Sequence, residues 1–179
     1  MSEDQHDAGA ALTVWFFDSA MGAAAAQLRL RGVSPRVAVV LDTVTMSWLH
    51  GTHAPRVGHA RRRAAASRRS ALAVFATSLL HPGLGGPTGV AAGAGAVTPA
   101  LGAVDREFRE EMRGRLVRGT SALLVLSTGT DLDGVRRLIE RGRAPGDITL
   151  MHASLPGGTL ASDRTGSPVA GDPKWLDGT

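Results

Sequence analysis

The sequence has 179 residues, which is room for one domain of ordinary size with an insertion or tails. It contains no cysteine, and this excludes a disulfide framework, a thiolate nucleophile and a thiolate metal site. The formal net charge is +4, but no acidic residue lies between Thr43 and Val104, so the excess positive charge is concentrated in the middle of the chain. Aromatic residues make up only 4%, so we expect a core of Val, Leu and Ala.

The first fifty residues predict two strands separated by a helix. Leu12–Phe17 is a short continuous apolar run, as is typical of a buried strand. Asp18 or Ser19 can cap a helix over Ala20–Leu30, because side-chain oxygens at this position accept hydrogen bonds from free backbone N–H groups. Val37–Trp48 is rich in Val, Thr, Met and Trp and predicts the second strand.

A basic stretch followed by a long uncharged stretch occupies the middle of the chain. Ala60–Ser70 is rich in Ala and Arg and predicts a basic helix, and Ala71–Leu80 is apolar. Residues 81–89 contain too many Gly and Pro to continue a helix, and Val90–Val104 consists mostly of small residues. We predict an inserted helix–turn–helix hairpin, in which Gly and Ala allow the close helix packing of a glycine zipper.

The remaining residues return to alternating helices and strands. The predicted elements are a helix over Asp105–Arg115 with Phe108, Met112 and Leu116 on one face, a strand over Ala122–Ser127, a helix over Asp131–Arg141, a strand over Ile148–Leu155 and a disordered tail over residues 156–179. The order βαβ–insertion–αβαβ indicates the α+β class and a ferredoxin-like core. We therefore predict one domain over residues 11–155, interrupted by the insertion at residues 56–104.

Several segments resemble a bacterial protein family. Val104–Phe108 and Arg118–Leu126 resemble the family pattern I-D-D-x-F … P-G-T-S-A-L-F-L-L, and Ile148–Leu155 is similar to its closing L-I-H-T-N-L. Val14–Asp18 is similar to its opening strand, and Met46–Trp48 is similar to the end of its second strand. The family is the uncharacterised "domain of unknown function 1269" group, whose members are usually described as predicted membrane proteins with a central glycine-rich hairpin. The resemblance therefore implies a membrane-associated bacterial protein.

The apolar hairpin leaves three interpretations open. A transmembrane helix needs about 20 predominantly apolar residues, and neither Ala71–Leu80 nor Val90–Val104 reaches that length, so two full spans are disfavoured. A shallow or re-entrant hairpin, or a glycine-zipper contact between subunits, fits the composition. A flexible, low-complexity insertion fits it as well.

The arginines that precede the hairpin have three candidate roles. They could contact anionic lipid headgroups, bind nucleic acid, or form a solvated basic helix. Nucleic acid is disfavoured, because no aromatic residue lies between Trp48 and Phe75 to stack on bases and no known reader motif is present.

Catalytic, metal and nucleotide sites are not supported by the sequence. His50, His53 and His59 lie in a predicted loop without a nearby Asp, Glu or Cys, so a metal site is disfavoured. The glycine-rich residues 83–89 lack the Gly-Lys-Ser/Thr of a phosphate loop. The carboxylates of residues 107, 110 and 111 alternate with arginines, as is typical of a solvated, salt-bridged helix face. We predict no catalytic activity, no metal and no cofactor.

The sequence thus predicts a membrane-associated or self-associating structural or interaction protein. The polar N-terminus lacks the features of a secretory signal, so we expect the cytoplasmic side of the cell membrane, or alternatively the cytoplasm. We expect a homo-oligomer and a membrane surface or anionic lipid as partners; the alternative is a soluble nucleic-acid-binding module that uses the arginine cluster. The predicted contact residues are Arg61, Arg62, Arg63, Arg68, Arg69, Leu72, Phe75, Leu79, Leu80, Gly89, Gly93 and Gly95.

Overall fold

The computed structural model describes residues 10–59, 70–80, 101–142 and 147–155. Its elements in chain order are β1 Ala10–Phe17, α1 Gly22–Leu30, β2 Val39–Ser47, β3 Arg56–His59, α2 Ala71–Leu80, α4 Arg106–Arg115, β4 Ser121–Thr128, α5 Leu132–Glu140 and β5 Ile148–Ser154. All five strands belong to one sheet, in the order β3-β2-β4-β1-β5. The predicted α+β class and the four predicted strands are confirmed.

Every neighbouring pair of strands in the sheet is antiparallel. β1 and β2, which α1 connects, therefore run parallel to each other with β4 between them. β4 and β5, which α5 connects, likewise run parallel with β1 between them. Each half of the domain is thus a βαβ unit whose two strands are separated by a strand of the other half. Because their strands alternate in the order β2-β4-β1-β5, the two βαβ units share one sheet.

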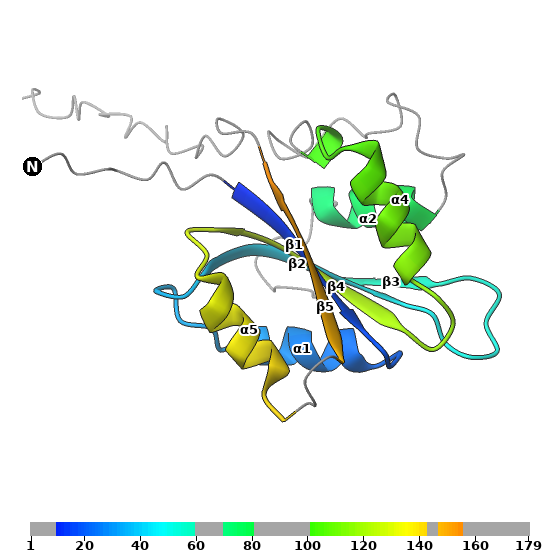
Figure 1. Cartoon of the computed structure of the whole chain (residues 1–179), viewed down its shortest axis with the longest axis horizontal. Helices are drawn as coiled ribbons and strands as arrows, with labels where there is room; N and C mark the ends of the chain where they lie inside the picture. The colour runs from blue at the N-terminus through cyan, green and yellow to red at the C-terminus, as the bar shows by residue number, and fades with distance from the viewer. Residues whose placement is uncertain (1–9, 60–69, 81–100, 143–146, 156–179) are drawn as a thin grey trace, which may run out of the picture.

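Helices cover both faces of this sheet (Figure 1): α1 and α5 on one face, α2 and α4 on the other. Along β1, successive side chains point to opposite faces. Trp15 and Phe17 pack with α1 and α5, whereas Leu12, Val14 and Phe16 pack with α2 and α4. Burial on both faces explains why the first predicted strand is a continuous apolar run rather than an alternating one.

The start of α1 differs from the prediction. Neither Asp18 nor Ser19 caps the helix with its side chain; Met21 is the N-cap residue and makes no side-chain cap hydrogen bond. The predicted helices over residues 105–115 and 131–141 correspond to α4 and α5 and do have aspartate caps. Asp105 accepts a hydrogen bond from the Phe108 N–H at 2.6 Å, and Asp131 accepts one from the Gly134 N–H at 2.9 Å.

β3 was not predicted. Arg56 is the first residue of the predicted insertion, but Arg56–His59 pairs antiparallel with Val44–Ser47 and extends the sheet by one edge strand. The strand is only four residues long and contains Gly58, so its apolar pattern is too short to predict a strand. The insertion therefore does not begin at residue 56.

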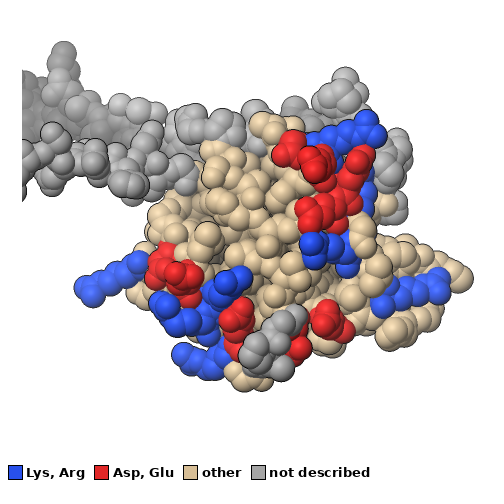
Figure 2. Space-filling model, in the orientation of Figure 1, with Lys and Arg blue, Asp and Glu red and all other residues tan. Residues whose placement is uncertain are grey.

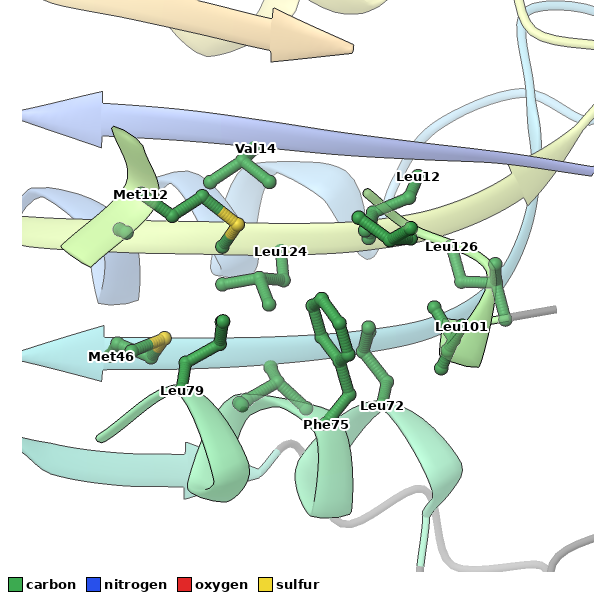
Figure 3. Close-up of a cluster of buried hydrophobic side chains, with 14 of the residues drawn as sticks. Leu12, Val14, Met46, Leu72, Phe75, Leu79, Leu101, Met112, Leu124 and Leu126 are labelled. Carbon is green, nitrogen blue, oxygen red and sulfur yellow. The ribbon is translucent and has the colours of Figure 1, made fainter. Parts of the chain in front are cut away.

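α2 is a helix, as predicted, but it packs differently from the prediction. Instead of forming a separate hairpin, it lies on the sheet, where Leu72, Phe75 and Leu79 enter the core between α2, α4 and the strands (Figure 3). Leu72 is fully buried, and Phe75 and Leu79 are 6% and 2% exposed. The predicted basic helix up to residue 69, the turn at 81–89, the predicted small-residue helix up to residue 100 and the tail lie outside the described residues.

Candidate functional site

The predicted contact residues fall into two groups. Leu72, Phe75 and Leu79 are core residues, and Leu80 is half-buried against the same core. These four side chains pack against the domain core because α2 lies over β2 and β3 and beside α4. The other predicted residues lie outside the described residues: Arg61, Arg62, Arg63, Arg68, Arg69, Gly89, Gly93 and Gly95. In sequence, α2 joins the arginine-rich residues 60–69 to the uncharged residues 81–100.

Two arginines of α4 bind the chain on either side of residues 81–100. The Arg113 Nε donates to the Leu79 carbonyl oxygen at 2.8 Å, near the end of α2. The Arg109 Nη2 donates to the carbonyl oxygens of Leu101 and Gly102 at 3.1 and 2.9 Å. Arg109 also stacks over the Phe75 ring, 5.6 Å from its centroid. α4 therefore holds the described residues that flank residues 81–100: Leu79 before them, and Leu101 and Gly102 after them.

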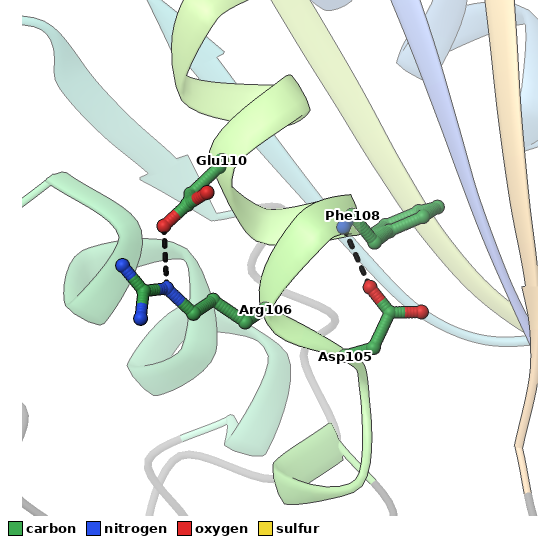
Figure 4. A network of polar contacts seen from close by, with 4 residues as sticks. All are labelled: Asp105, Arg106, Phe108 and Glu110. Atoms are coloured by element: carbon green, nitrogen blue, oxygen red, sulfur yellow. Dashed lines mark hydrogen bonds and ion pairs between the residues drawn. The ribbon is translucent and has the colours of Figure 1, made fainter.

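The exposed side of α4 carries two salt bridges of the kind that the sequence predicts, of which Figure 4 shows the pair Arg106–Glu110. Arg106 pairs with Glu110 at 2.6 Å and Arg115 pairs with Glu111 at 2.8 Å, each one helical turn apart. The hydrogen bond to Glu110, together with the charge of that carboxylate, raises the pKa of Arg106 above its ordinary value. Both pairs are exposed, so each contributes little to stability. The prediction of a wholly solvated arginine face is wrong for Arg109 and Arg113, which bind backbone carbonyls.

The segment Gly119-Thr120-Ser121 joins α4 to β4 and carries structural hydrogen bonds. The fully buried Ser121 hydroxyl accepts from the Ala23 N–H at 2.9 Å and donates to the Ser19 carbonyl at 2.6 Å. Ser121 thus caps α1 from a position that is 98 residues away from Ala23 in sequence. Gly119 has a φ of +89°, and a Cβ at this position would lie 2.5 Å from the His50 Nε2.

The three histidines that could suggest a metal site lie at or near the connection between β2 and β3. Among the described residues, no group of three His, Cys, Asp or Glu side chains is placed to hold a metal ion. His50 lies beside Gly119, in the connection between β2 and β3. His53 is exposed in the same connection, and His59 ends β3.

A hollow of about 160 Å³ lies between the end of α1 and the beginning of β2. It is lined by Leu30, Arg31, Val33, Pro35, Ala38, Val39 and Val40. Pockets that bind small molecules usually enclose about 300–1,000 Å³ and bring several polar groups together. This hollow has one charged side chain and is too small for a substrate or cofactor of ordinary size.

The two edges of the sheet differ in charge. At one edge, β3 is four residues long and carries Arg56, and the part of β2 that β3 does not cover, Val39–Thr43, carries Asp42; short, charged edge strands resist pairing with other chains. At the other edge, β5 has seven residues and contains no charged residue and no proline. Within the described residues, β5 pairs only with β1, and no described residue pairs with its outer edge; we refer to this side of β5 as the open edge.

The surface around β5 is uncharged, as the strand itself is. Figure 2 shows an uncharged band between the charged side chains of α4 and those near α5, in the view in which β5 is drawn in front of the other strands (Figure 1). The side chains of Thr149, His152 and Ser154 are exposed along β5. The open edge of β5 is therefore the candidate functional site that sequence reasoning missed. The signal in the sequence is the uncharged run Ile148–Ser154.

The described helices also bear on the predicted membrane contact. Among the described residues, none of the helices combines the length and apolar character needed to cross a bilayer. The longest apolar one, α2, has ten residues and belongs to the core.

Comparisons with known proteins give one match. Neither the curated proteins nor the solved structures contain a match to the chain. The family model described as "Protein of unknown function (DUF1269)" matches residues 70–156, just under half of the chain. This range runs from the residue before α2 to the residues after β5 and leaves out β1, α1, β2 and β3. Over residues 70–156, the resemblance to this domain of unknown function is confirmed.

Proposed function

We propose that this chain is a non-catalytic interaction protein that associates with copies of itself. The observation that carries the proposal is the open edge of β5, whose seven residues are uncharged and whose outer backbone groups pair with no described residue, so they can pair with another strand. Both faces of the sheet are covered by helices, so the edge is the part of the sheet left for a partner. Strand addition at an open edge is a common mode of recognition between proteins.

The roles of the polar side chains support the absence of catalysis. Ser121 and Thr120, the hydroxyl groups closest to a catalytic pattern, bind the backbone at Ala23, Ser19 and Val117. The carboxylates of Glu110 and Glu111 pair with arginines of their own helix on an exposed surface. These groups serve the fold and do not converge on a pocket, which an active site requires.

We also infer that the core is ferredoxin-like. The strand order β2-β4-β1-β5 and the antiparallel pairing support two interleaved βαβ units built on α1 and α5. In this description, β3 is an added edge strand, and α2 and α4 cover the face that α1 and α5 leave free.

Self-association is tested by sedimentation of the full chain over a range of concentrations. We expect the mass to rise from that of one 18.5 kDa chain toward that of two chains as the concentration increases into the micromolar range. Micromolar affinity is expected because one strand edge is a small interface. A mass that stays at one chain up to millimolar concentration would exclude the proposed function.

A second candidate function is contact with an anionic membrane on its cytoplasmic side. The observation that favours it is the basic segment at residues 56–69, which has six arginines and no acid. The apolar half of the predicted contact surface is buried in the domain at Leu72, Phe75 and Leu79. The arginines would therefore bind headgroups at the surface, without apolar insertion of α2.

The lipid candidate predicts a specific effect of three arginines. Replacing Arg61, Arg62 and Arg63 with alanine should weaken pelleting with phosphatidylserine vesicles by on the order of 100-fold, because each arginine near an anionic surface contributes about 1 kcal/mol. The triple variant R136A/R137A/R141A removes the same charge from the region of α5 and should have a much smaller effect. Equal losses in both variants would contradict a local site. Stronger binding to a single-stranded oligonucleotide than to vesicles would favour the nucleic-acid alternative.

A further inference from the structure

We infer that β5 pairs antiparallel with β5 of a second copy, in a register centred on Met151. The two sheets would then continue into one ten-stranded sheet across a two-fold axis. This inference rests on the proposed self-association and adds the surface and the register.

The backbone of β5 determines which of its groups are free. The Leu155 N–H donates to the Ala10 carbonyl at 2.8 Å, and the β1–β5 register places Leu155 opposite Ala10, so residue 155 is at a hydrogen-bonded position of this ladder. In an antiparallel pair, hydrogen-bonded and non-hydrogen-bonded positions alternate. Residues 149, 151, 153 and 155 therefore bond toward β1. The N–H and C=O groups of residues 148, 150, 152 and 154 point to the open edge.

Symmetry then selects the register. In an antiparallel pair, one residue number rises as the other falls, so the two paired residue numbers always add up to the same sum. A two-fold axis between identical strands adds that every pair of different residues occurs twice. A sum of 302 pairs Ile148 with Ser154 of the second copy and Leu150 with His152 of the second copy. All four outward-pointing residues then have partners, whereas a shift by two residues leaves at least one of them without a partner in β5. Met151 lies opposite its own counterpart.

Charge explains why the partner is a second copy. No residue from Ile148 to Ser154 is charged, so antiparallel self-pairing brings no like charges together. The other edge of the sheet consists of β3, which carries Arg56, and of the part of β2 that β3 does not cover, Val39–Thr43, which carries Asp42. The residues after Pro156 include Asp163, Arg164 and Pro168, and charge and proline both disfavour a strand there.

The surface next to the strand permits the approach. The charged side chains of α4 and α5 stand on either side of β5, and the band between them carries none (Figure 2). A two-fold axis perpendicular to the sheet keeps each helical layer on its own side. The approaching strand therefore meets the uncharged band of the second copy.

The register is tested by cysteine cross-linking of the full chain. Thr149 and Ala153 lie opposite each other across the inferred interface, at non-hydrogen-bonded positions where Cα atoms are about 4.5 Å apart, within the range for a disulfide. In one chain these residues are about 13 Å apart and cannot be bridged. The chain has no other cysteine. On oxidation, we expect the double variant T149C/A153C to form a covalent dimer.

The single variants are matched controls. T149C alone and A153C alone should stay uncrosslinked, because each cysteine faces an unmodified residue of the second copy. A mixture of the two single variants should form cross-links. Cross-linking of either single variant alone, or no cross-linking of the double variant under conditions in which sedimentation shows a dimer, would overturn the inferred register and leave self-association standing.

A backbone variant tests the edge independently of cysteine chemistry. The N–H of His152 points outward, so His152→Pro removes a hydrogen bond to the second copy but none to β1. With an unchanged circular dichroism spectrum, we expect dimerisation to weaken at least tenfold. Unchanged dimerisation would overturn the inference. A dimer that appears only after removal of residues 156–179 would also overturn it, since the chain's own tail would then occupy the edge. If the parent chain and every variant stayed monomeric, the proposed function would be excluded as well.

Discussion

Replacing Leu72 with alanine is expected to lower the free energy of unfolding by about 2–5 kcal/mol, whereas Leu28→Ala should change it by less than about 1 kcal/mol. Both leucines lie in helices and lose the same atoms. Leu72 is fully buried between α2 and the sheet, and Leu28 on α1 is 59% exposed. The difference therefore measures the burial of α2 in the core.

Urea unfolding of the two variants and the parent chain, followed by circular dichroism, measures these changes. Pelleting with anionic vesicles should be the same for the parent chain and for folded Leu72→Ala, because Leu72 does not reach the surface. If Leu72→Ala were as stable as Leu28→Ala and bound vesicles less well, α2 would contact lipid and not the core. Deletion of residues 71–104, which would test a separate hairpin, would instead remove part of the core and unfold the domain.

The elements of the sheet could be predicted because their signals are local. Leu12–Phe17 and the apolar run of β4 are buried on both faces, and the helices over residues 105–115 and 131–141 show apolar residues one turn apart behind an aspartate cap. β3 gave no such signal, since four residues with a central Gly58 are held by pairing with β2 and not by their own pattern.

The packing of α2 could not be predicted for a different reason. A ten-residue helix without charges has the same composition whether it is buried in a protein or lies in lipid. What decides between these environments is the neighbouring surface, here the side chains of Val44, Met46 and Leu124. These come from strands distant in sequence, so the choice depends on long-range contacts.

The candidate site was missed because it is a property of the sheet and not of a motif. The charged, apolar and glycine-rich clusters of the sequence lie in the middle of the chain, and the contact residues predicted from them lie between Arg61 and Gly95. The run Ile148–Ser154 reads as an ordinary strand. It becomes a candidate only because the strand order places it at an edge of the sheet. The opposite edge strand, β3, carries Arg56.

The resemblance to the family pattern pointed to Gly119-Thr120-Ser121 without indicating its role. Because Ser121 is the first residue of a buried strand, its hydroxyl lies inside the domain, beside the start of α1. There it supplies the cap that Asp18 and Ser19 were predicted to supply. The contact joins β4 to the β1–α1 connection, so this serine links the two halves of the domain.

Ser121→Ala is therefore expected to lower the free energy of unfolding by about 1–3 kcal/mol, because it leaves the Ala23 N–H and the Ser19 carbonyl without their hydroxyl partner. Ser34→Ala is the matched control: Ser34 is exposed and accepts only a long hydrogen bond of 3.3 Å from the Arg36 N–H, so we expect a change within about 0.5 kcal/mol. Urea unfolding measures both changes.

Hydrogen exchange separates the loss of this cap from a general loss of stability. In Ser121→Ala, the amide of Ala23 should exchange faster than in the parent chain by a larger factor than the amides in the middle of β4, because its acceptor is removed directly. If the Ala23 amide kept its protection, or if Ser121→Ala were as stable as Ser34→Ala, the hydroxyl would not cap α1. The Gly119-Thr120-Ser121 segment would then not join β4 to the β1–α1 connection through the Ser121 hydroxyl.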